Sequence, residues 1–232
     1  NNLLLTFSTI SVLFQVLHYN LITGGLYMTR KPRIWYPKST YHIMGRGVRQ
    51  QNIFTEPDDY SIFLVYLKHS LKKYNCTLHA YCLMTNHIHL LVETNDIPIS
   101  KFVKHLFNCY AQYYNRKYSF HGHLFEGRYK SGLIQNDSYF LQTSRYIHLN
   151  PVKATMVSAP QDYLWSSYSV LIGKTKDSIT SISKTLSFFG EDSISNYRHF
   201  VESSTEKYLS SEQKIQTEMG ESWKLVSGTN QF

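Results

Sequence analysis

Apolar residues in the middle of the chain follow the two-residue period of β-strands. Residues 77–84 and 87–93 are both rich in apolar and β-forming side chains, and the turn-forming pair Thr85-Asn86 lies between them. This pattern predicts an antiparallel hairpin. We expect two further strands, one beginning at Thr40 and broken by the run Gly45-Arg46-Gly47, and one over residues 129–134.

Three other segments carry signals of helices, and the apolar residues of the second recur at helical spacing. The first opens with Glu56-Pro57-Asp58-Asp59, which puts a proline and two acids in the first turn, and should end near Asn75. The second is expected from Pro98 to Lys117. The third should be capped by Asn136-Asp137-Ser138 and run through residue 146 towards residue 150, where Pro151 should stop it.

The order strand, helix, strand, strand, helix, strand is typical of an α+β sandwich of the ferredoxin-like or RNA-recognition-like type, with an antiparallel sheet. One more helix follows the fourth strand. We expect residues 28–171 to form this domain. From residue 172 the chain is richer in Ser, Thr and acidic residues, so we expect 172–232 to form a small, mostly helical extension whose end is frayed after about Ser203.

The first 27 residues contain no Lys or Arg. A signal peptide begins with basic residues, and Gln15, His18 and Asn20 interrupt the apolar run, so we expect neither a signal peptide nor a membrane span. The sequence begins with Asn, and Met28 is followed by a basic stretch. We therefore interpret 1–27 as an upstream or unstructured segment before a natural start at Met28.

The chain is basic, with 24 Lys and Arg against 16 Asp and Glu, which gives a formal net charge of +8. This balance favours a polyanionic partner. Aromatic residues make up 15% of the chain, and aromatic rings interleaved with positive charge suit unstacked bases. Three cysteines (Cys76, Cys82 and Cys109) are odd in number and lack CxxC spacing, so we expect no disulfide framework, no structural zinc site and a cytoplasmic location.

Two histidines, His87 and His89, lie on the second strand of the predicted hairpin. Because side chains alternate between the faces of a strand, both imidazoles project from the same face. Neutral imidazole binds several divalent ions, and two such ligands leave positions open for a phosphate oxygen and a third protein group. The alternative for a His-x-His pair taken alone is that both histidines have ordinary surface or hydrogen-bonding roles.

Tyr146 and Asn150 are four residues apart in the third predicted helix and so share one face of it. A phenol and an amide oxygen could thus face the same metal ion. Tyrosine, with an ordinary pKa near ~10, is a weak nucleophile at neutral pH, but a nearby cation and desolvation make attack by the phenolate on a phosphodiester feasible. The alternative for Tyr146 alone is a core aromatic residue.

Six short motifs resemble, in this order, those of REP-associated tyrosine transposases, which are relatives of the bacterial single-tyrosine HUH insertion-sequence transposases. The resemblance extends from about Thr40 to Tyr168. The motifs are Tyr41-His42-Ile43, Asn52-Ile53-Phe54, Met84-Thr85-Asn86-His87-Ile88-His89, Phe125-Glu126-Gly127-Arg128-Tyr129-Lys130-Ser131, Tyr146-Ile147-His148-Leu149-Asn150-Pro151 and Trp165-Ser166-Ser167-Tyr168.

This resemblance implies a metal-dependent nuclease and strand transferase that acts on single-stranded DNA with hairpins or palindromic repeats, as a monomer or homodimer. His87 and His89 would be ligands of Mg²⁺ or Mn²⁺, and Tyr146 would attack a phosphodiester to give a 5′-phosphotyrosine link and a free 3′-hydroxyl. Related transposases carry a polar ligand, often Gln, one helical turn after the tyrosine. That position is occupied here by Asn150, whose side chain is shorter.

Basic residues beside the motifs are expected to contact phosphates. They are Arg46, Arg49, Arg116, Lys117, Arg128 and Lys130. Two other interpretations stay open at this stage. A non-catalytic module could stack single-stranded nucleic acid on the open sheet, and an inactive transposon remnant would keep the fold without the activity.

Overall fold

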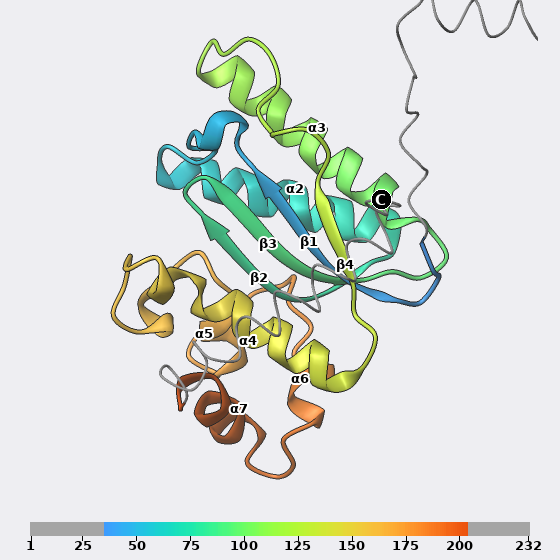
Figure 1. Ribbon diagram of the computed structural model, residues 1–232, viewed down its shortest axis with the longest axis vertical. Helices are drawn as coiled ribbons and strands as arrows, with labels where there is room; N and C mark the ends of the chain where they lie inside the picture. Colours follow the sequence, from blue (N-terminus) through green and yellow to red (C-terminus); the bar gives the residue numbers. More distant parts are fainter. Residues whose placement is uncertain (1–34, 204–232) are drawn as a thin grey trace, which may run out of the picture. The chain divides into compact units, whose positions relative to one another are not determined.

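The computed structural model describes residues 35–203, which lie in one compact unit. The segment 1–27 and the end of the extension after Ser203 lie outside the described residues. The strands are β1 (Thr40–Arg46), β2 (Thr77–Met84), β3 (His87–Glu93) and β4 (Lys130–Leu133), and the α-helices are α2 (Pro57–Tyr74), α3 (Ile99–Lys117), α4 (Asp137–Lys153), α5 (Tyr168–Leu171), α6 (Ser183–Ser187) and α7 (Ser193–Glu202) (Figure 1).

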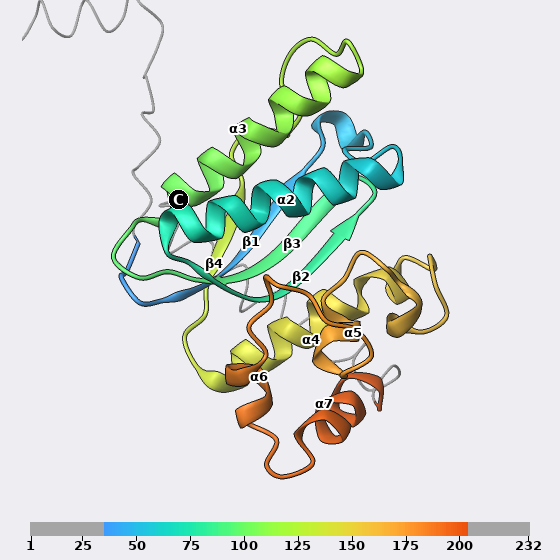
Figure 2. The same ribbon diagram turned by 180° about the vertical axis from the view of Figure 1, so that it is seen from behind.

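Within the described part of the chain, the four strands form one antiparallel sheet in the order β2-β3-β1-β4. The strand that carries the two histidines is therefore an inner strand. Helices α2 and α3 cover one face of the sheet and α4 crosses the other (Figures 1 and 2). This arrangement is the expected α+β sandwich, with the histidine pair on a central strand and Tyr146 on a following helix.

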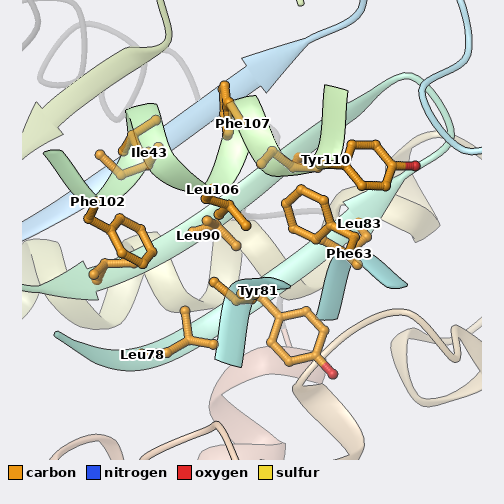
Figure 3. Packing of buried hydrophobic residues seen from close by; sticks show 14 of the residues in the cluster. Ile43, Phe63, Leu78, Tyr81, Leu83, Leu90, Phe102, Leu106, Phe107 and Tyr110 are labelled. Atoms are coloured by element: carbon orange, nitrogen blue, oxygen red, sulfur yellow. The ribbon is translucent and has the colours of Figure 1, made fainter. Parts of the chain in front are cut away.

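Side chains of β3 alternate between the two layers. Ile88, Leu90 and Val92 are fully buried in the core between the sheet and helices α2 and α3, part of which is shown in Figure 3. Leu91 packs in the second core, beneath α4, and His89 lies on that same face. The alternation expected for this strand is confirmed, and it separates the chemistry-bearing face from the larger apolar core.

Most of the predicted elements are observed close to their expected bounds. The hairpin strands begin and end as predicted, and β4 is one residue shorter at each end than expected. Helix α2 begins at Pro57 with a capping box formed by Glu56 and Asp59. The side chain of Asn136 caps α4 by accepting a hydrogen bond from the Tyr139 N–H at 2.8 Å.

The first strand ends within the run Gly45-Arg46-Gly47, as expected, although β1 continues through Gly45 to Arg46. A Cβ atom at Gly45 would lie only 2.4 Å from the ring of Phe107 on α3. The glycine therefore allows α3 to pack closely against an extended strand. It does not form a turn.

The expectation that Pro151 stops the third helix is wrong, because α4 continues to Lys153. Proline has a backbone angle compatible with a helix and costs mainly the hydrogen bond that its missing N–H cannot make. Ile147, Leu149 and Pro151 are buried, and their packing offsets that loss. The helix resumes its bonding when the Ala154 N–H donates to the Asn150 carbonyl at 2.9 Å.

The segment after residue 171 packs against the other side of α4. Its helix α7 contributes Tyr197 and Val201 to a small core that also contains Leu149 of α4 and Tyr168 and Leu171 of α5. Helices α6 and α7 lie in this segment, and its description as a mostly helical extension stays a prediction. Among the described residues, no helix is long and apolar enough to cross a membrane.

Candidate active site

The two histidines of β3 lie with their rings at nearly a right angle, 85°, and with ring centroids 5.1 Å apart. Each has its Nδ1 atom held by another side chain. His87 Nδ1 donates to Asn86 Oδ1 at 2.6 Å, and His89 Nδ1 lies 3.0 Å from Nε2 of His42 on β1. Metal-binding histidines are commonly held in this way through the nitrogen that does not face the metal, so the Nε2 atoms remain for a ligand.

The Nε2 atom of His89 is buried and has no hydrogen-bond partner among residues 35–203. Burial lowers the pKa of His89 well below its usual range. Burial, aided by the charge of Arg46, lowers the pKa of His87 to about 4. Both imidazoles are therefore neutral at physiological pH, which is the form that binds a cation. The donor set fits a divalent metal ion at this pair.

No group of three or more His, Cys, Asp or Glu side chains is arranged to hold a metal ion in the part of the chain that the structure describes. The histidine pair therefore supplies two ligands at most from these residue types. The remaining positions of an octahedral ion would be filled by water, by phosphate oxygens of a substrate or by another protein oxygen.

Helix α4 positions the phenol ring of Tyr146 beside the histidines of the sheet. Its centroid lies 5.5 Å from that of His89 and 5.9 Å from that of His42, in edge-on contacts. The ammonium group of Lys153, near the end of α4, lies 4.9 Å from the centre of the Tyr146 ring. The candidate nucleophile thus has the candidate metal ligands on one side and a positive charge beside it.

Asn150 is one helical turn after Tyr146, as expected, but its amide group bonds within the helix. Its Nδ2 donates to the backbone carbonyl of Tyr146 at 2.7 Å. Asn150 does not line the open cleft in front of the histidine pair. Its assignment as a third metal ligand stays a prediction.

An open cleft of about 540 Å³ lies in front of the histidine pair, which is a size typical of ligand sites. It combines the two histidines and Tyr146 with basic and aromatic side chains. The other lining residues are Met44, Gly45, Arg46, Gln50, Phe107, Phe125, Glu126, Arg128, Tyr129 and Lys130. The cleft can therefore offer both reactive groups and positive charge to a phosphodiester.

Three of the six expected phosphate-binding residues, Arg46, Arg128 and Lys130, line this cleft. The other three do not. Arg49 is exposed in the turn after β1, and Arg116 is exposed near the end of α3. Lys117 is paired with the carboxylates of Glu56 and Asp59. The proposed DNA contacts of these three residues stay predictions.

Two residues of the site were not identified from the sequence. His42 was noted only as part of a motif, although alternation along β1 puts it on the face opposite Tyr41 and Ile43 and thus on the histidine face. Lys153 lies beyond Pro151, where the helix was expected to have ended. Because α4 continues for two more residues, the Lys153 side chain reaches back over Tyr146.

The match to a family model identifies the class of protein as a transposase, a DNA-cleaving enzyme. Residues 36–150 match the family described as "Transposase IS200 like". This stretch includes β1 to β4 and α4 as far as Asn150. The chain belongs to the IS200-like transposase family.

One solved structure agrees with the fold. A REP-associated tyrosine transposase bound to a REP hairpin is 15% identical, with a TM-score of 0.53 over 66% of this chain and 98% of that chain. A Deinococcus radiodurans R1 protein assigned as a transposase is 21% identical, with a TM-score of 0.38 over 51% of this chain and 95% of that chain. No curated protein matches the sequence.

Proposed function

We propose that this transposase cuts and rejoins single-stranded DNA at hairpin-associated sites, with Tyr146 as the nucleophile and a divalent cation held by His87 and His89. The observation that carries the proposal is the convergence of three groups. The phenol ring of Tyr146 lies against His89, the Nε2 of His89 is buried without a partner among the described residues, and both face a cleft with basic walls.

In the proposed reaction the Tyr146 oxygen, as the phenolate, attacks the phosphorus of a phosphodiester. A bond forms between that oxygen and phosphorus, and the bond from phosphorus to the 3′ oxygen breaks. The 3′ oxygen leaves with the electron pair, takes a proton and becomes a free 3′-hydroxyl. A 3′-hydroxyl can later attack the phosphotyrosine by the reverse of this step, so strand transfer needs no external energy source.

Mg²⁺ or Mn²⁺ bound by the histidine pair would polarise a phosphoryl oxygen and align the phosphodiester. The protein's own groups have complementary roles. The positive charge of Lys153 favours the phenolate form of Tyr146, and Arg46, Arg128 and Lys130 would neutralise phosphates along the strand. The choice of a hairpin substrate is supported by the REP hairpin bound to the transposase of similar fold.

The test uses single-stranded oligonucleotides that carry a hairpin and flanking sequence, with Mn²⁺ or Mg²⁺. The expected products are a fragment with a free 3′-hydroxyl and a covalent adduct in which the 5′ phosphate of the other fragment is on Tyr146, located by mass spectrometry of peptides. Tyr146→Phe should form neither product. Tyr66→Phe, which removes a hydroxyl from half-buried Tyr66 on α2, is the matched control and should cleave normally.

Two results would contradict the proposal. One is the absence of cleavage and of adduct over a panel of hairpin substrates with either cation. The other is cleavage by Tyr146→Phe at the rate of the parent protein, which would assign the cut to a different nucleophile.

A further inference from the structure

A third histidine lies behind the metal-binding pair. His42, on β1, is fully buried, and its ring plane lies 23° from parallel to that of His89, with ring centroids 5.2 Å apart. The two are joined edge to edge by the contact between His42 Nε2 and His89 Nδ1. The sequence motif that contains His42 has no role in the proposed reaction.

The contact between these rings requires that one of them be the donor. Both rings are buried, and an environment of low dielectric constant favours the neutral form of an imidazole. A neutral imidazole has one N–H and one bare nitrogen. Of the two facing nitrogens, one therefore carries the proton and the other accepts it.

Two arrangements satisfy this condition. In the first, His89 Nδ1 donates to His42 Nε2, and the Nε2 of His89 has a free lone pair. In the second, His42 Nε2 donates, and the Nε2 of His89 carries a proton and cannot bind a cation. Each arrangement leaves one buried N–H, on His42 Nδ1 or on His89 Nε2, without a partner among the described residues. Neither is favoured by the rest of the hydrogen bonding.

We propose that His42 is a positioning residue that accepts the Nδ1 proton of His89, and so presents the bare Nε2 of His89 to the divalent cation. This inference rests on the proposed function of His87 and His89. At metal sites the acceptor for the second ring nitrogen of a histidine ligand is usually a carboxylate or a backbone carbonyl. A neutral imidazole does so here without adding a negative charge beside the phosphate that is attacked.

The first measurement is the affinity of the purified protein for Mn²⁺, from the electron paramagnetic resonance signal of the free ion. His42→Leu removes the acceptor and should weaken binding about 10-fold to 100-fold. His42→Gln restores an amide oxygen that can accept the proton, so it should recover most of the affinity. His79→Leu is the control, because His79 is a buried β2 histidine that bonds to Glu93 and does not line the cleft.

The second measurement needs no substitution and so does not depend on how well a variant folds. Nitrogen NMR of histidine side chains, with and without diamagnetic Zn²⁺, reports which ring nitrogen carries a proton. In the Zn²⁺ complex we expect protons on Nδ1 of both His42 and His89, and none on either Nε2.

The possible outcomes separate this inference from the proposed function. If the parent protein binds neither Mn²⁺ nor Zn²⁺, the metal site itself is refuted, and the role of His42 with it. If the parent binds and His42→Leu binds equally well, or if the complex has a proton on His42 Nε2, the positioning role alone is refuted. A loss of affinity as large in His79→Leu would also overturn it.

Discussion

Tyr197 on α7 has its hydroxyl 2.7 Å from Nδ1 of His148, which is two residues after Tyr146 on α4. The other ring nitrogen of His148 lies 2.9 Å from the Ser167 hydroxyl. The Ser167 oxygen also accepts a hydrogen bond from the Tyr81 N–H of β2 at 2.9 Å. The helix that carries the proposed nucleophile is therefore tied to the sheet through Ser167 and to the C-terminal segment through Tyr197.

Removal of the Tyr197 hydroxyl should destabilise the fold. This buried oxygen bonds to both His148 and Ser144, and Tyr197→Phe leaves two buried polar groups without that partner. We expect the free energy of unfolding in urea to fall by about 1–3 kcal/mol. Tyr66→Phe, at a half-buried position on α2, should lower the free energy of unfolding much less. Equal losses in the two variants would show that the hydrogen bonds on α4 add no particular stability.

Gly45 should not tolerate even one added methyl group. A Cβ there would lie 2.4 Å and 2.6 Å from two ring carbons of Phe107, so Gly45→Ala forces α3 or the ring to move. Overpacking of this kind costs about 1–3 kcal/mol, measurable by urea unfolding. The double variant Gly45→Ala, Phe107→Leu should be more stable than the sum of the single effects predicts. Additive losses would rule out the steric explanation.

Local patterns were sufficient to predict the elements of this fold. The hairpin of β2 and β3 follows from a two-residue period around a turn-forming pair, and Asn136 was identified as a cap from its place before a helical pattern. The exact ends of the elements near Gly45 and Pro151 have a different source. In both cases packing against residues far along the chain decides whether the strand or helix continues. Neither the spacing of apolar residues nor the local composition predicts that packing.

The same distinction applies to the site. His87 and His89 are two apart on one strand, so their shared face could be predicted. Placing Tyr146 beside them required the resemblance to a known family. His42 bonds to His89 across 47 positions of sequence, and this contact depends on the pairing register of β1 with β3, which the sequence pattern alone does not determine. To predict that Lys153 lies beside Tyr146, one would have to know that α4 continues beyond Pro151.

Asp59 should make the stability of the fold depend on pH. Its buried carboxylate accepts hydrogen bonds from the N–H groups of Thr55 and Glu56 and from Lys117. Burial alone would raise its pKa, but these hydrogen bonds outweigh that effect and the pKa of Asp59 is lowered. Because the pKa is lower folded than unfolded, the contribution is present above the unfolded value, near ~4, and is lost as pH falls through the folded one.

Asp59→Asn should thus be clearly less stable than the parent at pH 7, and the difference should shrink in acid. Urea unfolding at pH 7, 4 and 3 measures it. Asp58→Asn is the matched control, since Asp58 is exposed in the same helical turn and should change stability little at any of these pH values. A difference for Asp59→Asn that is independent of pH would exclude an ionised carboxylate as the stabilising species.

Lys153 should contribute to the rate of cleavage without contributing to metal binding. Its ammonium group is 4.9 Å from the centre of the Tyr146 ring, and a charge at that distance stabilises a phenolate by a few kcal/mol at most. We expect Lys153→Gln to slow cleavage roughly 10-fold to 100-fold and Lys153→Arg to be nearly unaffected. Mn²⁺ affinity should stay within about twofold of the parent, since the charge is not a ligand. Full activity of Lys153→Gln would exclude this role.

Arg128 should contribute to DNA binding through charge alone. It lines the cleft with Arg46 and Lys130, and each phosphate contact on a single strand adds about 0.7 to the slope of log affinity against log salt concentration. Arg128→Gln should therefore weaken binding of a labelled oligonucleotide and lower that slope by about 0.7, whatever the base sequence. Lys72 is an exposed residue of α2, which covers the other face of the sheet. Lys72→Gln should change neither the affinity nor the slope. If Arg128→Gln instead altered affinity for one sequence only, with the slope unchanged, Arg128 would be reading a base rather than neutralising a phosphate.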